Sequence, residues 1–143
     1  TDAGVPVSIL LAPLIHGLND EQIPAILEAA AERGAVGASY VLLRLPGPVE
    51  EIFVDWVEDH FPNRKTRILG RLRDLRDGEL NDTEFGRRMR GEGEWAKTYR
   101  QLFRSARASA GLDGNRPSLS TDQFRRLPGG QHSLFGDGTT PTQ

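Results

Sequence analysis

Two apolar runs separated by a helical pattern constrain the fold of this chain most strongly. The runs 5–15 (VPVSILLAPLI) and 38–45 (ASYVLLRL) are nearly continuous and contain β-branched residues. Such runs are typical of strands buried on both faces of a parallel sheet. Between them, four apolar residues fall on one helical face: Ile23, Ile26, Leu27 and Ala30. The pattern predicts a βαβ unit, whose crossover is right-handed in nearly all cases.

The boundaries of the predicted helix are marked by capping residues. Asn19 or Asp20 is suited to cap its first turn, Pro24 lies within that turn, and Gly34 can end the helix in a left-handed conformation. A single βαβ unit cannot stand alone, because each strand needs neighbours to bury its faces. We therefore expect an incomplete sheet or barrel. Because the chain begins at Thr1 rather than Met, we also expect a segment of a longer protein.

The remainder of the chain predicts helices followed by an unstructured tail. A stripe of five apolar residues begins after Pro48: Val49, Ile52, Phe53, Trp56 and Val57. A second helix over 64–76 directs four residues inward: Ile68, Leu69, Leu72 and Leu75. After a loop over 79–93, a third helix over 94–110 carries Trp95, Tyr99, Leu102, Phe103 and Ala106 on one face and ends at Gly111. We expect three parts: the βαβ unit over 1–47, a helical extension over 48–112, and a disordered tail over 113–143.

Composition excludes several kinds of site. The chain has no Cys, which rules out disulfides, thiolate nucleophiles and iron–sulfur ligation by these residues. Its three His residues are far apart and lack metal-ligand spacing, so we expect no metal site. No apolar run reaches the roughly 18 residues that a membrane span needs, and no signal peptide opens the sequence. We expect a cytoplasmic protein without membrane contact.

Charge is distributed unevenly along the chain. Residues 1–63 carry a net charge of −8, whereas residues 64–107 carry +6. A basic segment of this kind favours contact with nucleic-acid phosphates or an acidic partner. The alternative is that these charges form solvated helix faces and pair with one another. The candidate nucleic-acid contacts are Arg64, Lys65, Arg67, Arg71, Arg87, Arg88 and Arg90, with Arg73 and Arg76 in the same segment.

The loop after the first predicted strand is a candidate ligand site. His16 follows the carboxyl end of that strand, where α/β proteins bind their ligands. Gly17 permits close approach of the backbone, and the N–H groups that open the next helix can bind a polar group. The alternative is that residues 17–20 are only a good turn and cap.

Several longer strings carry a resemblance to a known family. These are 7–20 (VSILLAPLIHGLND), 23–27 (IPAIL), 40–46 (YVLLRLP), 53–56 (FVDW), 60–64 (HFPNR) and 85–91 (FGRRMRG). Together they resemble the C-terminal half of the barrel in radical SAM proteins of the spore photoproduct lyase-like group, often described as DNA repair photolyases. The resemblance implies that the two strands are the fifth and sixth of a (βα)6 partial TIM-like barrel.

The resemblance also implies contacts with S-adenosylmethionine. The family pattern GxIxGxxE lies near the adenine, and here Ile15 and Gly17 match it, Pro13 replaces the first Gly and Asp20 replaces the Glu. His16 and Asn19 lie in the same loop, and Leu43 and Arg44 would lie on the other side of the adenine.

The family's CxxxCxxC motif, which holds a 4Fe–4S cluster, is missing from this chain. Either the cluster-binding N-terminal half of the barrel precedes Thr1 in a parent protein, or this chain is catalytically inactive. The resemblance therefore implies the C-terminal portion of a radical SAM iron–sulfur enzyme, lyase-like and inactive alone. The alternative is a non-catalytic module that binds DNA or a sliding clamp.

The tail contains a short motif that favours the clamp. Residues 131–135 (QHSLF) resemble the QLSLF or QLDLF peptide with which bacterial proteins dock on the replicative sliding clamp. Leu134 and Phe135 would enter an apolar pocket and Gln131 would make polar contacts. The alternative is that Leu134 and Phe135 pack back onto the domain.

Overall fold

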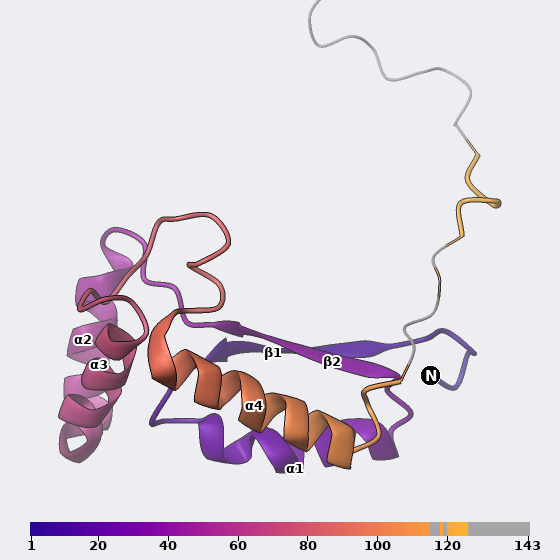
Figure 1. Ribbon diagram of the computed structural model, residues 1–143, viewed down its shortest axis with the longest axis horizontal. Helices are drawn as coiled ribbons and strands as arrows, with labels where there is room; N and C mark the ends of the chain where they lie inside the picture. Colours follow the sequence, from indigo (N-terminus) through magenta and orange to yellow (C-terminus); the bar gives the residue numbers. More distant parts are fainter. Residues whose placement is uncertain (115–117, 119, 126–143) are drawn as a thin grey trace, which may run out of the picture.

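A computed structural model of the chain describes residues 1–114, 118 and 120–125, and it contains one βαβ unit followed by helices. Strand β1 (Ser8–Leu14), the 3-10 turn η1 (Asp20–Gln22), helix α1 (Ile23–Glu32) and strand β2 (Gly37–Leu42) form the unit. Helix α2 (Val49–His60), the 3-10 turn η2 (Pro62–Arg64), helix α3 (Lys65–Asp74) and helix α4 (Gly93–Ser109) follow (Figure 1). The predicted βαβ unit and the three later helices are confirmed.

The two strands form a parallel pair in which Ser8 lies opposite Gly37 and Leu11 opposite Tyr40. The register is irregular between Leu11 and Leu14. Helix α1 connects the strands and ends where Gly34 adopts a φ of 81°, as the sequence predicts. The predicted cap is wrong, because neither Asn19 nor Asp20 makes a side-chain capping hydrogen bond here.

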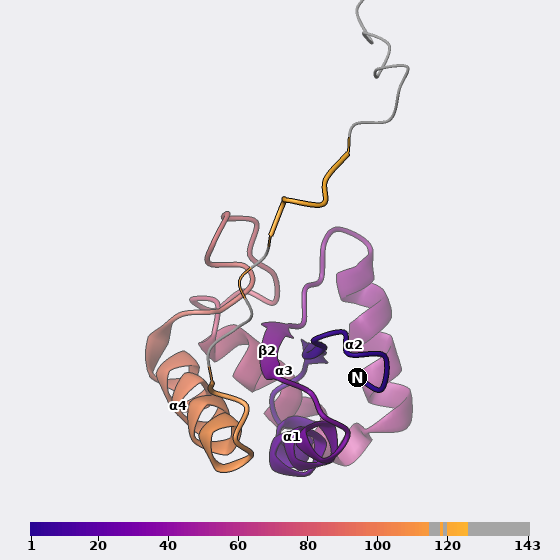
Figure 2. The ribbon, with the colours of Figure 1, turned by 90° about the vertical axis from the view of Figure 1, so that its right-hand side faces the viewer.

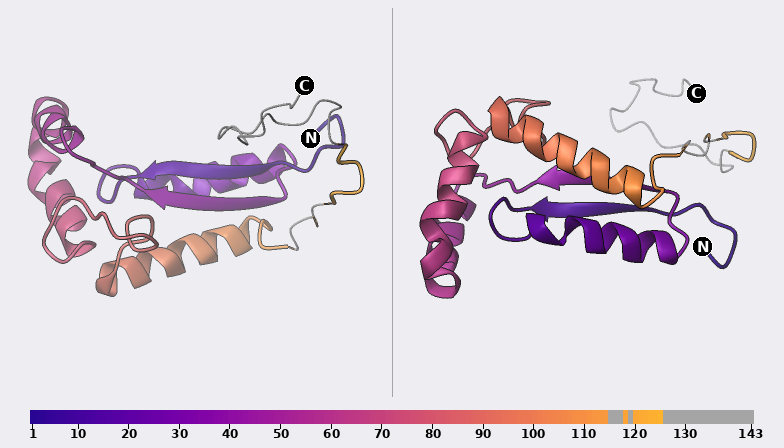
Figure 3. Two further views of the ribbon diagram at one scale, coloured as in Figure 1. Left: turned by 90° about the horizontal axis from the view of Figure 1, so that it is seen from above. Right: turned by 60° about the horizontal axis from the view of Figure 1, so that its bottom comes forward.

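Among the described residues, helices cover one face of the sheet and leave the other uncovered. Helices α1 and α4 lie side by side beneath the strands, and the α2–α3 pair stands at the carboxyl ends of the strands (Figures 1 and 2). Seen from above, no helix of the described residues lies over the strands (Figure 3, left). The prediction that both faces of the strands are buried is therefore wrong: Ile9 and Leu11 pack toward the helices, whereas Leu10 is 58% exposed.

The core has two clusters. One joins the sheet, α1 and α4 through residues such as Leu27, Leu42 and Phe103. The other joins α2, α3 and the loops through Val57, Ile68 and Leu72, among others.

The predicted inward faces hold for α3 and only in part for the other two helices. All four predicted α3 residues are buried. In α2 only Phe53 and Val57 are buried, while Val49, Ile52 and Trp56 face outward. In α4, Trp95 and Leu102 are partly exposed. The reason is geometric, since α2 and α4 each pack on one side and a narrow stripe suffices to fill that contact.

Candidate functional site

A buried polar contact with α4 fixes the loop between β1 and α1 in place. The Tyr99 hydroxyl donates a hydrogen bond of 2.8 Å to Oδ2 of Asp20. The Tyr99 ring stacks on the His16 ring with 3.3 Å between centroids and 22° between planes. His16 is fully buried and Asp20 is 7% exposed. These contacts join residues that are far apart in the sequence and fix α4 against the carboxyl end of β1.

Asn19 organises the backbone of the same loop. Its Oδ1 accepts a hydrogen bond of 2.8 Å from the Ile15 N–H, and its Nδ2 donates one of 3.1 Å to the Pro13 carbonyl. Gly17 has a φ of 81°, and a Cβ added there would lie 3.4 Å from Cγ of Arg67. The Arg67 side chain therefore covers Gly17, which leaves little room for a ligand at that position.

Three polar atoms of this cluster have no hydrogen-bond partner among the described residues: both ring nitrogens of His16 and Oδ1 of Asp20. Burial lowers the pKa of His16 to about 4, and the positive charges of Arg71 and Arg76 add to the shift, while Asp20 opposes it. Burial and the hydrogen bond to Asp20 raise the pKa of Tyr99. At neutral pH the cluster therefore contains a neutral imidazole and a neutral phenol. No group of three or more potential ligands in the described part of the chain is arranged to hold a metal ion.

The residues predicted to contact S-adenosylmethionine lie in two different environments. Pro13 and Asn19 border a groove of about 400 Å³ that runs along β1 and is shared with Ile26 and Ala30. His16, Gly17 and Asp20 are buried instead beneath α3 and α4.

The other three members of that set lie near the second core cluster. Ile15 belongs to this cluster, and Leu43 packs against it. The Leu43 carbonyl accepts a hydrogen bond from Arg76. Arg44 is half-buried, and its Nε has no partner in the residues that the structure describes. The eight residues therefore do not line one common pocket.

Four of the seven basic residues predicted to contact nucleic acid are engaged in ion pairs within the chain. Arg87 forms ion pairs with three carboxylates, at 2.5 Å to Asp82, 3.3 Å to Glu84 and 3.9 Å to Glu92. The other pairs are Lys65–Glu58 at 2.6 Å, Arg67–Glu21 at 3.6 Å and Arg71–Asp74 at 3.8 Å. Within the described ranges, Arg64, Arg88 and Arg90 form no ion pair.

Arg71 and Arg76 make contacts within the chain that the charge of the basic segment does not predict. The Arg71 guanidinium lies 3.2 Å from the centroid of the Trp95 ring. Arg76 is only 5% exposed and donates hydrogen bonds to the carbonyls of Leu43 and Leu80, so it has a structural role.

The contact between Tyr99 and Asp20 and the arginines of α4 are not among the features predicted from the sequence. The Tyr99–Asp20 pair left no local signal, because the two residues lie 79 positions apart. Arg100, Arg104 and Arg107 did leave a signal, since a spacing of four and three residues places them on one helical face. The clamp-like residues Gln131, Leu134 and Phe135 lie outside the described residues.

We expect Tyr99→Phe to destabilise the protein by about 1–3 kcal/mol, because it leaves the buried Asp20 carboxylate without its donor. Chemical denaturation at pH 7 measures this change. Tyr40→Phe is the matched control, since the Tyr40 hydroxyl makes no hydrogen bond within the described part of the chain. Equal losses in the two variants would contradict a special role for the contact between Tyr99 and Asp20.

The buried His16 predicts a specific dependence of stability on pH. Its pKa falls from an ordinary value of 6.5 to about 4 in the folded protein, so the unfolded state binds more protons between these values. The free energy of unfolding should therefore fall as the pH is lowered from 6.5 to about 4, by on the order of 3 kcal/mol from this group. His16→Phe keeps an aromatic ring against Tyr99 and should reduce this slope. Denaturation curves at several pH values test it, and an unchanged slope would contradict the assignment.

In the part of the chain that the structure describes, no helix combines the length and the apolar character needed to cross a membrane. Comparison with models of known protein families, with curated proteins and with solved structures finds no match to this chain.

Proposed function

We propose that this chain forms the C-terminal βαβ part of a (βα)6 partial barrel in a radical SAM iron–sulfur enzyme resembling spore photoproduct lyase. The observation that carries the proposal is the one-sided arrangement of the βαβ unit. Strands β1 and β2 are parallel neighbours, and helices cover only one of their faces. In a barrel of parallel strands, helices cover the outside and the other face looks inward, so a fragment of a barrel has this arrangement.

The groove along β1 supports the presence of a preceding strand and helix. In the described residues, β1 pairs with β2 alone, so its other edge has no strand partner. Apolar side chains of β1 line the groove together with Ile26 and Ala30 of α1. An apolar groove beside a free strand edge suits a further βα unit, which would pair its strand with β1 and pack its helix against α1.

The proposed cofactor fits some of the predicted residues better than others. Pro13 lies at the carboxyl end of β1 and Asn19 in the loop that follows it, where parallel α/β proteins bind their ligands, and Arg44 has an Nε without a partner in the described ranges. We assign contacts with S-adenosylmethionine to these three residues. His16, Gly17 and Asp20 are enclosed and do not fit direct contact, so we assign them the role of holding the loop in place.

When bound, the cofactor and its cluster supply one-electron cleavage of S-adenosylmethionine and hydrogen abstraction from the substrate. The cluster ligands would have to come from outside this chain, which contains no Cys. The alternative function is a non-catalytic module that binds DNA or a sliding clamp. The arginines that form no ion pair among the described residues favour its nucleic-acid form.

The coding DNA upstream of Thr1 distinguishes these two functions. An open frame with three Cys in CxxxCxxC spacing is the expected result, and the whole protein should then hold a cluster and form 5′-deoxyadenosine from S-adenosylmethionine. A stop codon followed by a start near Thr1 would contradict the enzyme and leave the binding module.

In the whole protein, we expect Arg44→Gln to weaken the binding of S-adenosylmethionine by about tenfold or more, because it removes a charged hydrogen-bond donor. Isothermal titration and the KM for 5′-deoxyadenosine formation measure the change. Arg33→Gln is the matched control, since Arg33 follows α1 at the opposite end of the strands. An unchanged affinity in Arg44→Gln would remove this residue from the cofactor site.

We expect Ile26→Glu to be tolerated in this chain alone but to destabilise the whole protein. Ile26 is 40% exposed in the groove and would be buried only when a preceding βα unit docks there. Ala29→Glu changes an exposed residue of α1 that does not line the groove and is the control. Thermal unfolding of both variants in both contexts measures the effect. If the two variants behave alike in the whole protein, the groove is not a docking surface for a barrel strand.

A further inference from the structure

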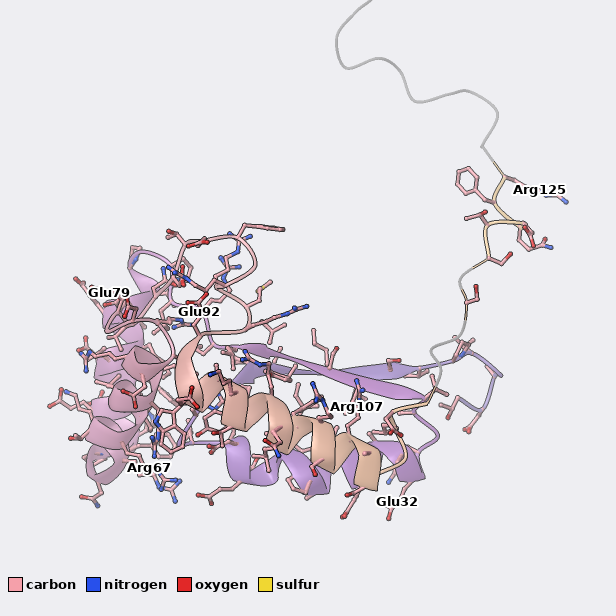
Figure 4. The ribbon with its side chains drawn as sticks, in the orientation of Figure 1. Glu32, Arg67, Glu79, Glu92, Arg107 and Arg125 are labelled. Carbon is pink, nitrogen blue, oxygen red and sulfur yellow. The ribbon has the colours of Figure 1, made fainter. Side chains whose placement is uncertain are left out.

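Two neighbouring hollows lie against helix α4 and share the same arginines. The first, of about 220 Å³, is lined by Ser39 and Tyr40 of β2 and by Arg90, Arg100 and Arg107. The second, of about 520 Å³, is formed by the loop 84–93 and again includes Arg90 and Arg100. The two hollows therefore belong to one continuous surface that extends from the loop, along α4, to β2. Figure 4 shows Arg107 on the side of α4 that faces the strands.

Except for Arg87, the arginines of this surface have no carboxylate partner among the described residues, whereas its acidic residues are all engaged in ion pairs. Residues 82–107 carry seven basic and four acidic side chains, a net charge of +3. Arg87 pairs with Asp82, Glu84 and Glu92, and Lys97 pairs with Glu94 at 2.5 Å. No ion pair within the described residues involves the others: Arg88, Arg90, Arg100, Arg104 and Arg107. Arg104 lines a third hollow on α4 together with Arg100, and we call Arg90, Arg100, Arg104 and Arg107 the α4 basic face.

Burial and hydrogen bonding also indicate that guanidinium groups of this surface lack partners among the described residues. The Nε atoms of Arg88 and Arg107 are enclosed but have no hydrogen-bond partner among the described residues. Tyr40 lines the first hollow together with Arg90 and Arg100; burial raises the pKa of Tyr40, and the positive charges of the two arginines act against that shift. Guanidinium groups in this state are suited to bind the oxygens of an anionic ligand.

An exposed aromatic ring lies beside the same surface. Phe85 lines the second hollow and is 87% exposed, although phenylalanine is usually among the more buried residues. The guanidinium of Arg88 lies 5.2 Å from the centroid of its ring. A basic groove combined with an accessible aromatic ring is the arrangement with which proteins bind single-stranded nucleic acid, by contacting phosphates and stacking on bases.

We propose that the α4 basic face binds the phosphates of a single-stranded nucleic acid and that Phe85 stacks on one of its bases. A duplex fits less well, because its bases are already stacked on one another and cannot cover Phe85. The α4 basic face shares only Arg90 with the contacts predicted from the sequence, since Lys65, Arg67 and Arg71 of that prediction are engaged in ion pairs on α3. The proposal does not depend on radical chemistry, which would take place at the carboxyl end of β1.

Fluorescence anisotropy of the full chain with a labelled oligothymidylate of about 15 nucleotides tests the proposal. We expect binding that weakens as salt is raised, and a matched duplex should bind more weakly. Phe85→Ala should reduce the affinity for the oligonucleotide by about tenfold. Because Phe85 is exposed, the variant should keep the wild-type circular dichroism and urea midpoint, which separates lost binding from lost folding.

Two triple variants that each remove three positive charges show which surface of the protein binds the oligonucleotide. Replacing Arg100, Arg104 and Arg107 with Gln should lower the slope of log affinity against log salt by about 2, since each phosphate contact contributes roughly 0.7 on single strands. Replacing Lys65, Arg67 and Arg73 with Gln removes the same charge from η2–α3 and should change binding much less.

Three results would overturn the proposal. One is a duplex that binds as tightly as the single strand, and another is a larger loss from the α3 triple variant than from the α4 triple variant. The third is unchanged affinity in Phe85→Ala, with heparin or anionic vesicles binding as well as the oligonucleotide, which would indicate an unspecific polyanion surface. None of these results bears on 5′-deoxyadenosine formation, so the barrel proposal stands or fails separately.

Discussion

The buried contact between α4 and the loop after β1 is the interaction on which the arrangement of this chain depends. Tyr99 donates to Asp20 and stacks on His16, and so anchors the N-terminal half of α4 at the carboxyl end of β1. Farther along the helix, Phe103 and Ala106 pack in the core that the sheet and α1 share. With this anchor in place, α4 lies beside α1 and completes the cover of one face of the sheet.

Covering one face leaves the other face and the outer edge of β1 open in the described residues. Two parallel strands bury too little surface to be independently stable, and most parallel sheets are covered on both faces. The apolar groove beside β1 and the exposed Leu10 are consequences of this geometry. They are the physical basis of our proposal that the unit belongs to a larger barrel.

Ion pairs in the fold, rather than position along the sequence, determine which basic side chains of this chain are neutralised. Acidic side chains from η1, α2 and the loop before α4 neutralise Lys65, Arg67 and Arg87. The arginines of the α4 basic face have no such acidic partners in the described part of the chain. The basic segment therefore divides into a self-compensated region on η2–α3 and an uncompensated face on α4, where an external polyanion would meet less competition.

The sequence by itself determined the local structure. Its periodicity gave the two strands, the crossover helix and the three later helices, because hydrophobic spacing and the Gly34 stop act over a few residues. It also placed the loop 16–20 at the end of β1, where the polar cluster lies.

Only the tertiary structure shows which faces are buried and which charged side chains form no ion pair among the described residues. Contacts between distant segments leave Ile52 and Leu10 exposed and enclose His16 and Asp20. Such a contact also pairs Arg67 with Glu21. Hydrophobic periodicity cannot predict these contacts. It indicates which side chains share a face of a helix or strand, but not which other segment packs against that face. For the same reason, the spacing of the α4 arginines in the sequence shows that they share a helical face. Only the packed fold shows that they lack the ion pairs that neutralise other arginines among the described residues.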